Sequence, residues 1–159
     1  MYIPIIYKLV RWAERCRITY LCNKMNVGNK VTIKAGFQAS RPKKITINDN
    51  VSIHTNCTFQ AQAPITIGSG TMIAANCTLV TANHEISIND GDNHIGEPVK
   101  APITIGENCW LGTNVTILPG VTIHSGAVIA AASVVTRDMP ANMICMGTPA
   151  KPVKERPLA

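Results

Sequence analysis

The chain repeats an apolar residue every six positions over most of its length. A six-residue period matches neither the 3.6-residue period of an amphipathic helix nor the plain alternation of a flat strand. It is typical of short strands joined by tight corners, with three units closing one triangular coil. The units begin at Val27, Ile33, Ala39, Ile47, Ile53, Phe59, Ile67, Ile73, Leu79, Ile105, Leu111, Ile117, Ile123, Ile129 and Val135. The period therefore predicts an all-β prism of about five coils, stacked about 4.8 Å apart.

One long stretch interrupts this period, because no unit begins between Leu79 and Ile105. The steps from Ala39 to Ile47 and from Phe59 to Ile67 each contain two extra residues. The interruption falls at the corresponding corner of the third coil. We therefore expect residues 80–104 to form a loop that leaves the prism at one edge.

Composition and charge limit the classes of function and partner that the chain can have. The chain has 159 residues, enough for one domain with a sizeable core, and 46% of them are hydrophobic. The formal net charge of +6 suits nucleic acid, anionic lipid or a phosphorylated small ligand. No motif that reads RNA or DNA is visible, so no nucleic acid partner is expected.

The chain has six cysteines, which form no CxxC pair. Three of them, Cys57, Cys77 and Cys109, occupy a position of the six-residue unit where a small residue is expected. Buried thiols in a reducing cytoplasm explain them better than a metal or disulfides.

The first 26 residues form a separate segment before the β domain of residues 27–159, whose tail begins at residue 137. Ile5, Leu9, Trp12 and Cys16 fall at helical spacing among basic residues, which predicts an amphipathic helix. The helix can cap the open end of the first coil or touch an anionic membrane surface. No transmembrane run and no signal peptide are visible, so we expect a cytoplasmic protein, with the inner membrane face as a peripheral alternative.

Four pieces of the sequence, "TANHEI", "APITIGENCWLGTNVTILPGVTI", "VIAAASVVTRDMP" and "GTPAKPVK", carry a family resemblance. From Val27 to Lys154 the chain resembles the hexapeptide-repeat acyltransferases, which fold as left-handed parallel β-helices. It is most similar to the branch of galactoside, maltose and polysaccharide O-acetyltransferases. The repeat alone implies fold and not function, because carbonic anhydrases and noncatalytic scaffolds share it.

His84 is the candidate catalytic residue. It lies near the start of the interruption, and an imidazole can accept a proton from a hydroxyl at neutral pH. A lone histidine in a loop is more often only a surface residue. The resemblance implies the catalytic role, because the family's general base occupies the matching place.

A metal site is not expected. Carbonic anhydrases of the γ class resemble this scaffold and hold zinc with three histidines, two of them five residues apart. Here Asn89 follows His84 by five residues and Leu79 precedes it by five. The pair that a zinc site would need is therefore missing.

The resemblance also implies acetyl-CoA as co-substrate, bound outside the prism between two subunits of a homotrimer. The positions that match the family's cofactor contacts are Trp110, Thr113, Ala131, Thr136, Arg137, Lys151 and Lys154. Backbone N–H groups at Thr113 and Ala131 would face the thioester, and the lysines would suit phosphates. Trp110 serves either as core filling or as a wall beside the thioester, and the lysines either bind phosphate or belong to a solvated tail. The family's usual glycine at position 132 is alanine.

The acceptor is implied to be a sugar, a polysaccharide or a lipopolysaccharide precursor. The matching positions are Ser40, His54 and Gln62, of which only the serine keeps the family's residue. His54 replaces an asparagine and Gln62 replaces an aspartate, so a different alcohol is expected. Two alternatives stay open: N-acetylation of an amino sugar or nucleotide sugar, and a noncatalytic β-helix assembly module.

Overall fold

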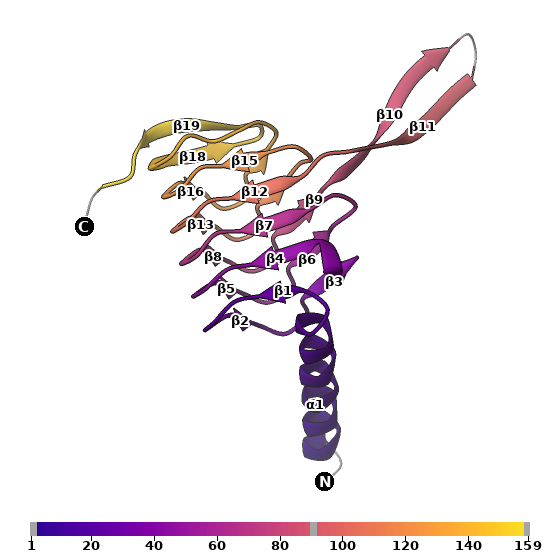
Figure 1. Ribbon diagram of the computed structural model, residues 1–159, viewed down its shortest axis with the longest axis vertical. Coiled ribbons are helices and arrows are strands. Elements are labelled where there is room, and N and C mark those ends of the chain that lie inside the picture. The colour runs from indigo at the N-terminus through magenta and orange to yellow at the C-terminus, as the bar shows by residue number, and fades with distance from the viewer. Residues whose placement is uncertain (1–2, 90–91, 158–159) are drawn as a thin grey trace.

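The structure is a computed structural model that describes residues 3–89 and 92–157, with side chains for residues 6–85 and 96–157. Its body is a three-sided prism wound from short parallel strands (Figure 1). One helix extends from the N-terminal end, and an antiparallel hairpin projects from one edge (Figure 1). The predicted fold class, a parallel β-helix with an N-terminal helix and one extruded segment, is confirmed.

Each coil contributes one strand to each of three faces. Face A contains β1 (Asn26–Val27), β4 (Ile45–Ile47), β7 (Ile65–Ile67), β12 (Ile103–Ile105) and β15 (Thr122–Ile123). Face B contains β2 (Thr32–Ile33), β5 (Ser52–Ile53), β8 (Met72–Ile73), β13 (Trp110–Leu111), β16 (Val128–Ile129) and β18 (Met143–Gly147). Face C contains β3 (Gln38–Ser40), β6 (Thr58–Gln60), β9 (Thr78–Val80), β14 (Thr116–Ile117) and β17 (Val134–Val135). We call the prism's edges AB, BC and CA after the faces that they join.

The prism has about six turns rather than the predicted five. On face B, β18 adds a sixth parallel strand beside β16, and Met139 bridges to Ile123 on face A. The final strand β19 (Ala150–Glu155) then pairs antiparallel with β18. The last turn escaped the sequence analysis because Met139 and Cys145 do not keep the six-residue spacing from Val135. Part of the region expected as a tail is therefore ordered sheet.

The interruption of the period is an ordered hairpin. Strands β10 (Ala82–Asn89) and β11 (Asp92–Lys100) pair antiparallel from Ala82 and Lys100 outward. The hairpin leaves the prism after β9 on face C and returns before β12 on face A, so it stands on the CA edge (Figure 1). Residues 90–91 of the predicted loop lie outside the described part of the chain.

The core is a stack of aliphatic side chains inside the three faces. The predicted unit-start residues from Ile47 to Val135 are buried, most with no exposed surface. Ile45, Ile65 and Ile103 pair in register on face A, so like residues lie above one another. Phe37 and Phe59 pack edge to face, with ring centroids 5.1 Å apart. Full burial of each such side chain contributes about 1.5–3 kcal/mol, and together they hold the faces against each other.

The corners need residues that tolerate a left-handed backbone. Gly36 has φ of 78°, and a Cβ there would overlap the side-chain oxygen of Asn56. Asn56, Asn76 and Asn114 adopt φ near 60° at successive corners of the BC edge. Asparagine and glycine are the residues that adopt this conformation most readily. Ala132 stands at the same edge with φ of 59°, although its Cβ disfavours that region.

Helix α1 (Ile3–Cys22) packs on the prism through its last turns, and Val10 and Arg11 line a hollow that it shares with the first coil. Leu21 and Met25 join the core cluster at the first coil. Arg17 donates to the carbonyl of Phe37 at 2.6 Å, and the carboxylate of Glu14 accepts from the N–H of Gly36 at 2.6 Å. The earlier turns project beyond the first coil (Figure 1). Over the described residues, no helix combines the length and the apolarity needed to cross a membrane.

We predict that Ala132→Gly raises the free energy of unfolding by about 0.5–1 kcal/mol. Removal of Cβ relieves the left-handed strain, and the larger unfolded-state entropy of glycine offsets part of the gain. Urea denaturation followed by circular dichroism measures the change. Ala75→Gly is the matched control, because Ala75 lies at the same edge without a positive φ, and it should lower stability. A loss of stability in Ala132→Gly would contradict the assignment of strain.

Candidate active site

The base of the hairpin is tied to the prism at Thr81, the residue before β10. Thr81 is fully buried, and its hydroxyl donates to the carbonyl of Gln60 at 2.9 Å while accepting from the N–H of Ala63 at 2.8 Å. On the returning side, the N–H of Ala101 donates to the carbonyl of Thr81 at 3.0 Å. Both strands of the hairpin thus start from fixed points. A side chain close to these points, such as that of His84, has a defined place on the CA edge.

The imidazole of His84 is held by the opposite strand. Its Nδ1 lies 3.0 Å from the carbonyl oxygen of Gly96, an arrangement in which Nδ1–H donates. The ladder is irregular between His84 and Ile86, where the register shifts. A Cβ on Gly96 would lie 3.1 Å from the Cβ of Glu85, so glycine allows the two strands to approach here. With the proton on Nδ1, Nε2 carries a free lone pair on an exposed ring.

Two predicted acceptor residues share the CA edge with His84. Ser40 pairs in register with Gln60, and Gln60 with Val80, so one column leads from Ser40 to the start of the hairpin. Gln62 follows at the same edge, where its carbonyl accepts from Nζ of Lys44 at 2.6 Å. Ser40 and Gln62 line one shallow depression, whose walls are Gln38, Ala39, Ser40, Thr58, Phe59, Gln60 and Gln62. The structure therefore gathers His84, Ser40 and Gln62 along one edge.

Most predicted cofactor residues lie elsewhere, on face B and the BC edge. Trp110 is 50% exposed on the outside of face B, so it does not fill the core. Thr113 and Ala131 stand at successive corners of the BC edge, where the carbonyl of Thr113 accepts from the N–H of Ala132 at 2.8 Å. Among the described hydrogen bonds, the N–H groups of Thr113 and Ala131 have no protein acceptor. Such N–H groups can bind a carbonyl or an oxyanion.

Glycine at position 112 shapes this edge. A Cβ there would lie 2.6 Å from the nitrogen and 2.9 Å from the Cα of Ala131, so a larger residue would push the coils apart. Met72 also belongs to this surface and was missed by the sequence analysis. It pairs in register with Trp110 and is 46% exposed. The sequence did contain a signal for Met72, since it is an apolar residue at the last, outward-facing position of the unit that begins at Ile67.

His54, predicted as an acceptor contact together with Ser40 and Gln62, lies on the BC edge. Its backbone N–H donates to the carbonyl of Ile73, and its side chain is exposed. Its column continues upward through Ala74, Gly112 and Ala130. Within one chain, His54 therefore lies with Trp110 and Thr113 and not with the other acceptor residues.

The remaining cofactor positions divide between the two regions. Lys151 and Lys154 are exposed on β19, opposite Met146 and Ile144 of face B. Thr136 and Arg137 form the exposed last corner of the CA edge, next to Asp138, whose carboxylate accepts from the N–H of Thr122 at 2.7 Å. One chain thus presents its candidate residues in two groups on two different edges, and we call these groups half-sites.

The core cysteines are inaccessible to a substrate, because their side chains are buried inside the prism. Cys57, Cys77, Cys109 and Cys145 are buried and unpaired in disulfides. Burial raises the pKa of the Cys109 and Cys145 thiols, which keeps them protonated. The thiol of Cys57 donates to the carbonyl of Ala74 at 3.1 Å, and that of Cys77 to the carbonyl of Gly112 at 3.1 Å. Nor do three His, Cys, Asp or Glu side chains gather as metal ligands within the described residues.

The sequence matches a known family signature and several known acetyltransferases. The sequence signature "Bacterial transferase hexapeptide (six repeats)" matches residues 102–137. A protein of Schizosaccharomyces pombe assigned as an acetyltransferase is 44% identical over 120 residues, covering 76% of this chain. A protein of Escherichia coli K12 assigned as a colanic acid biosynthesis acetyltransferase is 35% identical over 131 residues, covering 82% of this chain. The chain spans 54% of the length of the first relative and 69% of the second.

Solved structures share the fold. A maltose O-acetyltransferase from Clostridium difficile 630 superimposes with a TM-score of 0.80 at 30% identity, covering 89% of this chain and 75% of its own. A hexapeptide-repeat acetyltransferase from Vibrio cholerae O1 biovar eltor, complexed with acetyl coenzyme A, gives 0.80 at 33% identity, covering 89% of this chain and 77% of its own.

Proposed function

Because the chain belongs to the hexapeptide-repeat acetyltransferase family, we propose that it transfers the acetyl group of acetyl-CoA to a carbohydrate hydroxyl. The observation that carries this proposal is the imidazole of His84, whose Nδ1 contacts the carbonyl of Gly96 while no described group bonds to Nε2. The Escherichia coli relative is named for colanic acid biosynthesis, and the Clostridium difficile structure is named a maltose O-acetyltransferase. Both names support an acceptor that is a sugar, a polysaccharide or a lipopolysaccharide precursor.

The proposed reaction is a direct transfer. Nε2 of His84 takes the proton of the acceptor hydroxyl, and the hydroxyl oxygen attacks the thioester carbonyl. The N–H groups of Thr113 and Ala131 stabilise the oxyanion that forms, because neither has a protein acceptor among the described hydrogen bonds. Collapse expels the CoA thiolate, which takes up the proton from His84. The buried core thiols take no part in this route.

The two half-sites suggest how a complete site is built. His84, Ser40 and Gln62 stand on the CA edge, whereas Trp110, Thr113 and Ala131 stand on face B and the BC edge. We propose a homotrimer in which the CA edge of one subunit faces the BC edge of the next. His54 would then reach the acceptor from the neighbouring subunit, and Met72 and Trp110 would wall the groove for the CoA arm. In this arrangement Lys151 and Lys154 contact the phosphates of CoA.

The acceptor half-site favours a hydroxyl over an amino group. Ser40 and Gln62 are neutral, and no carboxylate lines the depression that they share. A protonated amino sugar would lack an anionic partner there, whereas a neutral alcohol can exchange hydrogen bonds with both side chains. An assay with amino sugars and nucleotide sugars beside neutral glycans distinguishes N-acetylation from O-acetylation.

We expect His84→Ala to lower turnover by about 10²- to 10⁴-fold, because it removes the general base. Release of free CoA thiol with an accepted sugar measures the rate. Calorimetry should show unchanged acetyl-CoA affinity, since the transferred proton belongs to the acceptor. His124→Ala is the matched control, as His124 is also exposed but lies outside both half-sites. A His84→Ala enzyme that keeps a tenth or more of wild-type turnover would refute the role.

Mixed trimers test the shared site. His84→Ala disables one half-site, and Ala131→Trp blocks the other without filling the core, because Ala131 is exposed. Each variant alone should be inactive. Random mixing places an intact His84 beside an intact Ala131 at about a quarter of the interfaces, so about a quarter of wild-type activity should return. Co-expression with two affinity tags supplies the mixed trimers. No recovery in verified mixed oligomers, or a fully active monomer in sedimentation, would reject the subunit arrangement.

Neutralising the tail lysines should weaken cofactor binding and spare turnover. Lys151→Gln with Lys154→Gln is expected to raise KM for acetyl-CoA about tenfold, the effect of two exposed ion pairs of about 0.7 kcal/mol each. The turnover number should stay the same, because phosphate contacts are equal in the ground and transition states. Lys30→Gln with Lys34→Gln is the control for net charge. A collapse of turnover at unchanged KM would contradict phosphate binding.

A further inference from the structure

The projecting part of helix α1 exposes an unusual amount of apolar surface. Among the residues of this part whose side chains are described, five large apolar ones have more than half of their surface exposed: Ile6 58%, Tyr7 61%, Leu9 58%, Val10 62% and Trp12 66%. Isolated exposed apolar residues are ordinary, but a continuous group on one projecting helix marks an interaction site. The last turns of the helix pack on the prism. Val10, Arg11 and Arg15 line a hollow that opens between the helix and the first coil.

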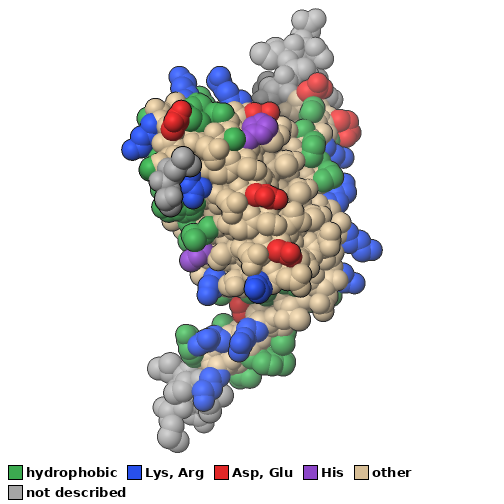
Figure 2. Space-filling model, turned by 60° about the vertical axis from the view of Figure 1, so that its left-hand side comes forward, with side chains coloured by type: hydrophobic (Ala, Val, Ile, Leu, Met, Phe, Trp, Pro, Cys, Tyr) green, Lys and Arg blue, Asp and Glu red, His purple; other side chains and the backbone are tan. Residues whose placement is uncertain are grey.

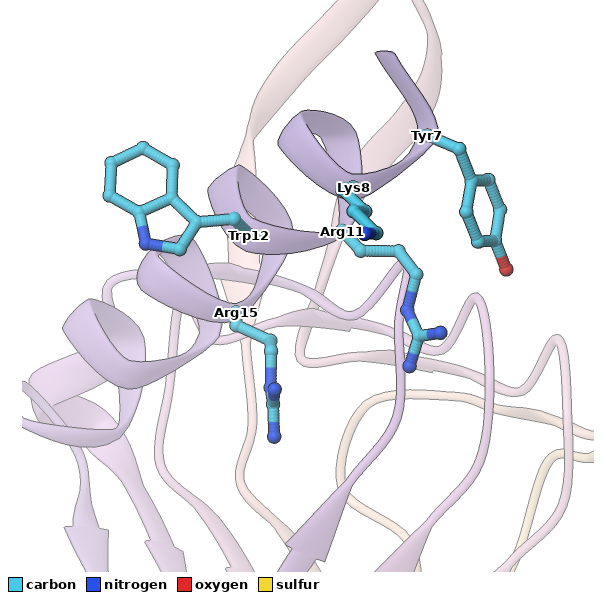
Figure 3. Close-up of a pocket in the computed structure, with 5 residues that line it drawn as sticks. All are labelled: Tyr7, Lys8, Arg11, Trp12 and Arg15. Carbon is cyan, nitrogen blue, oxygen red and sulfur yellow. The ribbon is translucent and has the colours of Figure 1, made fainter. Parts of the chain in front are cut away.

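Basic residues form a ridge along the same turns. Lys8, Arg11 and Arg15 follow one another at helical spacing and share one hollow with Tyr7 and Trp12 (Figure 3). Figure 3 shows the side chains of Arg11 and Arg15 extending in the same direction from the helix, below the rings of Tyr7 and Trp12 in this view. The guanidinium of Arg11 lies 5.7 Å from the centroid of the Tyr7 ring. Blue and green side chains gather together on the helix at the lower end of Figure 2.

The charge of the chain is strongly polarised toward this end. Residues 1–48 contain ten of the 15 Lys and Arg residues and one of the nine Asp and Glu residues. Their net charge is +9, and residues 49–159 carry −3, which together give the +6 of the whole chain. The one acid, Glu14, pairs with Arg17 at 2.8 Å, and this hydrogen bond, with that from Gly36, lowers the pKa of Glu14. Among the described residues, the Glu14–Arg17 pair is the one salt bridge of the helix, so its other basic side chains keep an unpaired charge.

From the combined apolar and basic surface we propose that helix α1 and the surrounding first coil bind an anionic lipid bilayer. Trp and Tyr are the residues that prefer the boundary between headgroups and acyl chains, and each Lys or Arg near an anionic surface adds attraction. The first turns of α1 enter this boundary, while Lys8, Arg11 and Arg15 contact the headgroups.

A second copy of the chain is a poorer occupant. Pairing two α1 helices through the stripe of Leu9, Trp12 and Cys16 would bring Lys8 and Arg15 of one copy close to those of the other. The stripe offers no acidic side chain to neutralise them, because Glu14 is tied to Arg17 and Gly36. Like charges that approach in this way are destabilising. An anionic surface relieves the same charges.

The lipid contact is independent of acetyl transfer, and its geometry is compatible with the proposed trimer. Glu14 and Arg17 fix the direction of α1 through Gly36 and the carbonyl of Phe37. The helix continues beyond the first coil along the long dimension of the molecule (Figure 1). Three subunits assembled with parallel prisms would present three helix tips at one end. All three can enter one bilayer, which multiplies a weak single contact.

Vesicle flotation of the full chain tests the proposal. We expect the protein to float with vesicles of phosphatidylcholine containing phosphatidylglycerol and to stay in solution with phosphatidylcholine alone. Raising the salt from about 0.05 to 0.5 M should release most of it, because salt screens the attraction between basic residues and lipid. Equal binding to neutral vesicles, or no binding to anionic ones, overturns the proposal.

Two matched double variants separate the helix from general surface effects. Lys8→Gln with Leu9→Gln removes one basic and one apolar side chain from α1 and should weaken partitioning at least about tenfold. Val99→Gln with Lys100→Gln makes the same change on the hairpin, where Val99 is 53% exposed, and should leave partitioning unchanged. Circular dichroism confirms that each variant stays folded. Equal losses in both pairs, or unchanged partitioning of the α1 variant, overturns the assignment of the contact to α1.

Tryptophan quenching measures which part of the molecule enters the lipid. The chain has two tryptophans, so Trp110→Phe leaves Trp12 as the only one. Vesicles with brominated acyl chains should quench Trp12 in this variant, and Trp110 in Trp12→Phe should stay unquenched. Absence of Trp12 quenching overturns the insertion. If the α1 variants instead change the sedimentation coefficient without lipid, the helix is an interface between copies of this chain and the proposal fails.

Discussion

The hydrogen-bond ladder between successive coils is the constraint on which the rest of the molecule depends. Lys34, His54, Ala74, Gly112 and Ala130 each donate from the backbone to the coil above, at 2.8 to 2.9 Å. Since each coil rises by about 4.8 Å, residues far apart in the chain are stacked in straight columns along an edge. A functional residue therefore has its place set by the edge and the coil that it occupies.

This regularity explains why much of the fold could be predicted from the sequence. The inward side chains must be apolar and compact, so residues such as Ile53, Ile73 and Leu111 reveal the coil directly. The sixth turn could not be found in this way, since Met139 and Cys145 belong to coils that the period does not reach. The hairpin could be recognised only as an interruption of the six-residue period, because pairing between its two strands does not produce that period.

The site was predictable as residue types but not as an arrangement. The position of His84 follows from the interruption and from the family resemblance, whereas its contact with the carbonyl of Gly96 depends on a backbone approach that no side-chain pattern encodes. The position of His54 in the fold, in contrast, could not be predicted from the sequence. His54 is a candidate acceptor contact by its matching position, and only the order of the faces shows that it stands on another edge than Ser40 and Gln62. Whether a helix packs along its length or projects, as α1 does, is likewise decided by tertiary contacts.

The hairpin on Thr81 has a consequence for how such proteins diversify. Ile103 pairs with Ile65 in the register that the previous coil already uses, although more than twenty residues lie between Val80 and Ile103. Because the ends of the inserted segment meet at neighbouring anchors, its length adds little to the entropy cost of closing it. The strand register of the prism thus does not depend on the length of the segment inserted at this corner. Natural variation can therefore change the length and sequence of the hairpin beyond His84 while the prism folds as before.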